Sequence, residues 1–141
     1  MRSRNIAAEL RELVARRARG QCEYCLTAES ISLGTCAVDQ IIAIKHGGES
    51  DQDNLAYCCS LCNRYKGTDV ASYDALSGEL TLLYHPRRQR WLDHCDVNPD
   101  GTLLALTAIT RVTIRLLQLN RKERLSERRL LIQHQMLNLP Q

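Results

Sequence analysis

Two cysteine motifs, Cys22-Glu23-Tyr24-Cys25 and Cys59-Ser60-Leu61-Cys62, bracket the part of the chain that decides the fold. In each motif the two intervening residues let both thiolates of a tight turn bind one metal ion, and two such turns give the closed sulfur site typical of structural zinc. A redox dithiol is the rival interpretation of a single motif, but two motifs in a small chain favour zinc. Because only Cys59, and not Cys58, has the required spacing to Cys62, we assign Cys59 as the ligand.

The composition of the chain bounds its class. Its 141 residues include seven cysteines, five tyrosines, one tryptophan and no phenylalanine, so aliphatic side chains must build the core. This length suits one domain, and we predict a single domain over residues 1–141. The sequence shows neither an apolar stretch long enough to span a membrane nor a signal-peptide core. We expect a cytoplasmic protein with no membrane partner, whose remaining cysteines are reduced thiols: Cys36, Cys58 and Cys95.

Hydrophobic spacing predicts the elements around the two motifs. Apolar residues recur at helical spacing over 4–19, and Gly20 follows as a stop signal. Short apolar runs over 37–44 and 55–58 have the length of strands, and 60–66 forms a short helix. The first half of the chain therefore predicts helix, strand, strand and helix in that order.

The second half of the chain carries two turn signals and two helical patterns. Ser77-Gly78 and Asp100-Gly101 predict two hairpins within a small β region over 74–106, with strands that include 91–97. A helix is expected over 108–119. A last helix would run from Asn120, as its N-cap, to about residue 137.

The residues between and after the cysteine motifs carry a family resemblance. They read Ala37-Val38-Asp39-Gln40-Ile41-Ile42, then Lys45-His46-Gly47-Gly48, Asp53-Asn54-Leu55 and finally Asn63-Arg64-Tyr65-Lys66-Gly67. This order resembles the HNH endonuclease family over about 17–67, with a C-terminal extension over about 68–141. The resemblance implies an α+β fold with a zinc-stapled ββα-metal core. It also implies a metal-dependent phosphodiester hydrolase that binds nucleic acid, expected to be DNA.

The resemblance implies roles for several residues of this core. Asp39 and Asn63 would be the protein ligands of a catalytic Mg²⁺ or Mn²⁺, and Asn54 would brace the loop by hydrogen bonds. A turn Asp and a helix Asn without any metal are the structural alternative. Arg64, Lys66 and Lys45 would contact the nucleic-acid backbone, although solvated helix and loop residues explain the same pattern.

The general base is where this chain departs from the family pattern. The family has His where this chain has Gln40, and an amide cannot accept a proton from water. His46 is the one candidate substitute within the core, and a loop-bracing histidine is the structural alternative. The sequence therefore predicts an endonuclease-like protein with weakened or lost activity. The alternative is an inactive HNH-fold module that binds nucleic acid or protein.

The basic residues of the C-terminal part leave the choice of partner open. Only three of the nineteen basic residues of the chain are lysines, and the arginine fork suits phosphate groups. Seven basic residues lie over 111–129, where either a solvated helix face or phosphate contacts would explain them. A homodimer or a protein partner held by the C-terminal helices is a further expectation.

Overall fold

The computed structural model describes residues 6–31 and 35–140. Helix α1 spans Ala8–Arg17 and lies within the predicted 4–19, of which residues 4 and 5 fall outside the described part. It buries Val14 completely, and Gly20 takes the left-handed conformation (φ 68°) beyond its end. A glycine adopts this conformation without steric cost, but Arg19 is already left-handed (φ 57°), and the helix ends at Arg17, two residues before the predicted end.

The middle of the chain forms a strand pair followed by a helix. Strands β1 (Cys36–Gln40) and β2 (Leu55–Cys59) pair antiparallel, and α2 (Ser60–Lys66) follows β2 directly. The predicted strand over 37–44 is too long, because Ile44–His46 forms a 3-10 turn (η1). A second 3-10 turn, η2 (Gln52–Asn54), leads into β2.

Two small hairpins follow, and both form at the predicted turns. Strands β3 (Ala71–Tyr73) and β4 (Leu80–Leu82) pair antiparallel, as do β5 (Cys95–Val97) and β6 (Leu103–Ala105). The prediction of strand over 91–94 is wrong, because Trp91–His94 is the short helix α3.

The two C-terminal helices are α4 (Ala108–Leu117) and α5 (Lys122–Gln133), the second ending four residues before the predicted end. The predicted N-cap role of Asn120 is wrong. Its side chain instead accepts from the backbone N–H of Leu103 (2.8 Å) and donates to the Leu103 carbonyl (2.9 Å), and Arg121 takes the N-cap position. Asn120 therefore holds the end of α4 against β6.

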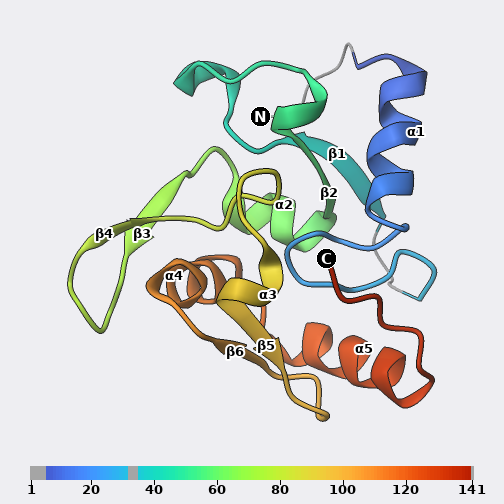
Figure 1. Cartoon of the computed structure of the whole chain (residues 1–141), viewed down its shortest axis with the longest axis vertical. Helices are drawn as coiled ribbons and strands as arrows, with labels where there is room; N and C mark the ends of the chain where they lie inside the picture. Colours follow the sequence, from blue (N-terminus) through green and yellow to red (C-terminus); the bar gives the residue numbers. More distant parts are fainter. Residues whose placement is uncertain (1–5, 32–34, 141) are drawn as a thin grey trace.

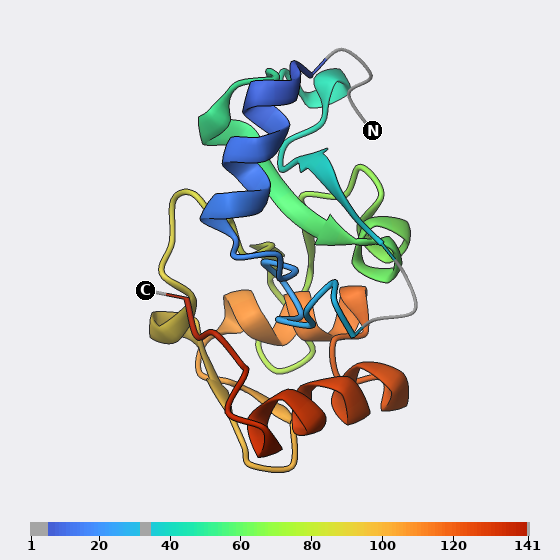
Figure 2. The same cartoon turned by 90° about the vertical axis from the view of Figure 1, so that its right-hand side faces the viewer.

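The elements gather in two halves, with α1, β1 and β2 in one and α4, α5 and the β5–β6 hairpin in the other (Figures 1 and 2). One buried cluster lies between α1 and the β1–β2 pair and includes Val14, Val38 and Leu55. The larger cluster joins the four motif cysteines to apolar residues of the C-terminal part, among them Trp91 and Leu117. The fold is α+β, as predicted, and the cysteines lie inside its main core.

Candidate functional site

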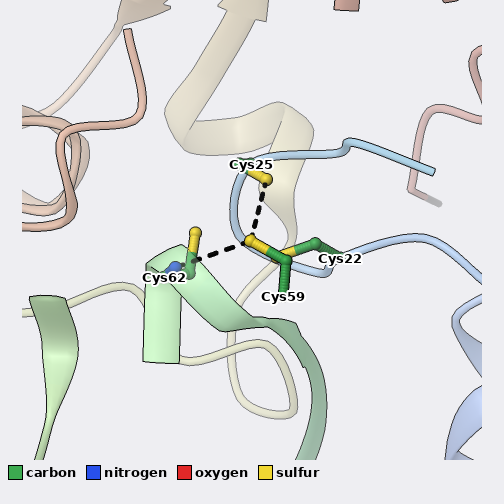
Figure 3. A group of neighbouring side chains, drawn as sticks. All are labelled: Cys22, Cys25, Cys59 and Cys62. Carbon is green, nitrogen blue, oxygen red and sulfur yellow. Dashed lines mark hydrogen bonds between the residues drawn. The ribbon is translucent and has the colours of Figure 1, made fainter. Parts of the chain in front are cut away.

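The four motif cysteines meet in the core. Cys22 and Cys25 come from the loop after α1, Cys59 from the end of β2, and Cys62 from the first turn of α2. Their Sγ atoms all lie within 4.8 Å of one another, and each residue is at most 1% exposed. Figure 3 shows Cys25 and Cys62 on either side of Cys59, whose Sγ is 3.7 Å from the Cys25 Sγ. The choice of Cys59 over Cys58 is confirmed, since Cys58 is not part of this group.

The geometry and chemistry of this group fit a structural metal such as zinc. Zinc–sulfur bonds of about 2.3 Å in a tetrahedron place the sulfurs about 3.8 Å apart, close to the Cys25–Cys59 separation. Burial raises the pKa of the Cys22 thiol, whereas the hydrogen bond with Cys22 lowers the pKa of the Cys25 thiol. Four buried thiolates therefore need a cation among them, and a divalent ion supplies it.

The other three cysteines lie outside this group. Cys58 and Cys95 are buried, and Cys36 is half-buried at the start of β1. Burial raises the pKa of the Cys95 thiol to about 12, so it stays protonated at neutral pH. All three are free thiols in the structure.

Asp39 and Lys66 are two buried residues of opposite charge. Asp39 is 1% exposed on β1, and the Lys66 side chain, also 1% exposed, reaches back from the end of α2. The Lys66 ammonium donates to the Ile41 carbonyl (2.9 Å); burial lowers the pKa of Lys66, and the carboxylate of Asp39 opposes that shift. The expected contact between Lys66 and a nucleic-acid backbone does not fit this placement, because the ammonium is turned into the protein.

Gln40 lies on the other face of β1 from Asp39, because successive side chains of a strand alternate. The side chain of Gln40 is 0% exposed, and its Nε2 donates to the Ser50 hydroxyl (2.9 Å). Its neighbour Val38 on the same face packs into the cluster with α1. The residue that replaces the family histidine thus serves as a buried link between β1 and the following loop.

Asn54 and His46 both hold the loop between the two strands. The Asn54 Oδ1 accepts from the Ile42 N–H (2.9 Å), and its Nδ2 donates to the carbonyls of Ile42 (2.9 Å) and Glu49 (2.7 Å). His46 is exposed, and its Nε2 lies 3.1 Å from the Thr68 carbonyl oxygen, which orients the ring toward the backbone after α2. These contacts correspond to the loop-bracing interpretation of both residues.

The remaining predicted residues lie around α2 and the loop. Asn63 is half-buried on α2, whereas Arg64 on α2 and Lys45 on η1 are exposed. The carboxylate of Asp39 and the amide oxygen of Asn63 are donor types that hard ions such as Mg²⁺ take. Lys66 also interacts electrostatically with Asp39, so its positive charge would compete with a metal ion for that carboxylate.

Several basic residues over 111–129 make contacts within the protein. Arg111 forms a salt bridge with Asp74 (2.9 Å), and Arg121 one with Glu123 (2.9 Å). Arg124 and Arg128 on α5 are 7% and 0% exposed and point to the cysteine group. Sequence reasoning missed these two, although their spacing of four residues places them on one helix face. The basic residues over 111–129 are therefore only in part exposed to solvent.

Comparison with known proteins identifies one part of the chain. Residues 22–69 match the family model described as HNH endonuclease. No curated protein and no solved structure matches the chain. Among the described residues no helix has the length and apolar character needed to cross a membrane. The matched range begins at Cys22, the first motif cysteine, and ends just after α2, so this segment of the chain is similar to the HNH endonuclease family.

Proposed function

We propose that the HNH domain of this protein binds DNA and that its cleavage of phosphodiester bonds is strongly attenuated. The proposal rests on the residue at position 40, where the family has a histidine. A glutamine stands there, buried and bonded to Ser50, in a domain that otherwise has the family's cysteines, aspartate and asparagines. The scaffold is retained, and the proton acceptor is missing.

The chemistry of the site divides between the ion and the chain. A divalent ion held by Asp39 and Asn63 would polarise the scissile phosphate. Activating the attacking water is a separate task that needs a proton acceptor, and general-base catalysis contributes about 10²–10⁴-fold to a rate. His46 is exposed, and the contact of its Nε2 with the Thr68 carbonyl orients the ring toward the backbone after α2.

Cleavage is tested by restoring the histidine. Supercoiled plasmid is incubated with Mg²⁺ or Mn²⁺ and either the natural protein or Gln40→His. We expect Gln40→His to nick the plasmid about 10²-fold faster than the natural protein, since it regains a base. Equal rates for the two proteins would contradict the assigned role of position 40.

The controls for this assay keep the fold and change the chemistry. Adding Asp39→Asn to Gln40→His removes the carboxylate charge at almost constant volume and should abolish nicking. Zinc content and the melting temperature of each variant show that it is folded. Nicking that survives Asp39→Asn would show that the cleavage does not depend on this site.

DNA binding is tested at the exposed arginine of α2. The affinity for a short duplex is measured as a function of salt for the natural protein, Arg64→Gln and the control Arg129→Gln, an exposed arginine of α5. Loss of a phosphate contact should weaken binding at every sequence and reduce the salt slope by about one. A duplex affinity that does not depend on salt, or equal effects of both variants, would overturn the proposed interface.

The alternative is a module that docks a protein partner, and the exposed apolar side chains of the β3–β4 hairpin favour it. Tyr73, Leu80 and Leu82 are each more than 60% exposed. Exposed apolar patches of this kind mark interaction sites. Two results together would support this alternative. The natural protein would bind DNA with an affinity that does not depend on salt, and Leu80→Ser would lose self-association or partner binding.

A further inference from the structure

Helix α5 presents two buried arginines to the four-cysteine group. Arg124 is 7% exposed, and its Nη1 lies 3.7 Å from the Sγ of Cys59. Arg128, one helical turn later, is 0% exposed, and its Nη1 donates to the backbone carbonyl of Cys25 (3.0 Å). Each of the two cysteine turns is thus contacted by one guanidinium of the same helix.

Arg128 is held in place by further neutral oxygens. Its Nε donates to the Gly101 carbonyl (2.7 Å), and its Nη2 donates to the Oδ1 of Asn120 (3.1 Å). Asn120 is itself fixed by two hydrogen bonds to Leu103. These bonds and the bond to Cys25 engage each of the three guanidinium nitrogens, but they do not supply a negative charge.

A fully buried arginine requires a counter-charge nearby, since an uncompensated buried ion is very costly. Four thiolates around a divalent cation carry a net charge of −2, and this charge is buried with the cysteines. Two guanidinium groups beside it carry +2. Glu127, 18% exposed at its side chain, pairs with the outer Nη2 of Arg124 (2.7 Å) and offsets part of that charge.

We propose that Arg124 and Arg128 are the counter-charges of the four-cysteine metal centre, so that metal retention and the docking of α5 are energetically linked. The sulfur ligands come from the HNH domain, whereas the positive charges come from the C-terminal part that the family model does not cover. Residues beyond the direct ligands orient and stabilise metal sites by such contacts. This inference does not depend on whether the protein binds or cleaves DNA.

The first experiment separates charge from packing at position 124. The zinc-loaded protein is mixed with excess chelating dye under native conditions, and the rate of zinc release is followed. Arg124→Met keeps an unbranched side chain without the charge, and Arg124→Lys keeps the charge. We expect release about tenfold faster for Arg124→Met, because loss of a partner that contacts a metal ligand weakens metal binding by about 10–100-fold. For Arg124→Lys we expect release less than about threefold faster.

The matched control is Arg129→Met, which removes an exposed arginine from the same helix. It should release zinc at the rate of the natural protein. Equal release from Arg124→Met and Arg124→Lys would show a packing role and overturn the proposal, as would release from Arg124→Met at the natural rate. If Arg124→Met cannot be loaded with zinc while Arg124→Lys can, the charge role is supported; if neither can be loaded, it is overturned.

The second experiment tests the link to α5. Amide hydrogen exchange is measured on zinc-loaded natural protein and zinc-loaded Arg124→Met. The amides of α5 should exchange at least about tenfold faster in the variant, while those of α1, which packs into the separate cluster with β1 and β2, keep their rates. Unchanged protection of α5 would contradict the linkage.

Discussion

His85 is held in one tautomer by the backbone that follows it. Its Nδ1 accepts from the N–H groups of Arg87 and Arg88 (3.2 Å each), so the proton of the neutral ring sits on Nε2. The ring lines a cavity of about 130 Å³ together with Lys66 and Ile41. A histidine bonded in this way is a fixed neutral donor and not a proton acceptor, which excludes it as a substitute for the base missing at position 40.

The first prediction concerns the titration of His85. Burial, and then the charge of Arg88, lower the pKa of His85 to about 4. Between pH 6.5 and 4 the unfolded chain therefore binds more protons than the folded chain at this position. The contribution of His85 to stability is complete above pH 6.5 and is lost as the pH falls through 4. Unfolding free energies measured over this range should fall less steeply for His85→Gln, and a ring that titrates near pH 6.5 by NMR would contradict this.

Single residues differ in how far the sequence predicts them. The four clustered cysteines were predictable because each pair is fixed by a spacing of three positions along the chain. Asn54 was predictable for a similar reason, since its bonds all stay within the loop that contains it. Arg124, Arg128 and Lys66 were not, because the pattern of charges does not tell which helix face is buried.

At the scale of elements, the tip of the β5–β6 hairpin packs against α5. Gly101 has a φ of 94°, and a Cβ built on it would lie 2.5 Å from the Leu125 carbonyl oxygen. The Gly101 carbonyl also accepts the hydrogen bond from Arg128 (2.7 Å). This glycine therefore serves both the turn and the approach of the helix.

The second prediction compares two glycines in hairpin turns. Gly78 also has a positive φ (75°), but a Cβ there would meet nothing within 4 Å. Gly78→Ala should cost about 1 kcal/mol through backbone strain alone. Gly101→Ala should cost about 1–3 kcal/mol more, since its Cβ would also overlap α5. Chemical unfolding of both zinc-loaded variants measures the difference, and equal losses would show that α5 tolerates a displaced turn.

Among the elements, those fixed by local signals were predicted best. The helix over 60–66 and the turns at Gly78 and Gly101 follow from residues within the segments themselves. Helix α3 was misread because long-range contacts stabilise it. The His94 carbonyl accepts from the Leu106 N–H (2.9 Å) and from the Thr110 hydroxyl, and neither partner is close in sequence.

At the scale of the whole molecule, the cysteine group joins the two halves of the chain. The main buried cluster combines all four ligands with apolar residues from α3 to α4. Binding of zinc to a four-cysteine site contributes about 10–16 kcal/mol, which is comparable to the whole stability of a typical domain. The predicted single domain over 1–141 remains a prediction, and a shared metal core favours it.

The third prediction is the effect of metal removal. Chelation with the thiols kept reduced should abolish the cooperative thermal transition, and added Zn²⁺ should restore it. Melting is followed by circular dichroism together with the metal content of each sample. A fully metal-free protein that melts cooperatively at the same temperature would show that the cysteine group is not a structural metal site.

The contact between Arg128 and Cys25 also bears on how the protein is made. The two residues are 103 positions apart, and ribosomes add about 5–20 residues per second. The first cysteine turn is therefore synthesised on the order of 5–20 s before its covering helix. During that interval the thiols of the nascent chain are accessible to metal ions and oxidants. A chaperone or an early metal ion would therefore have its largest effect on the yield of folded protein in this interval.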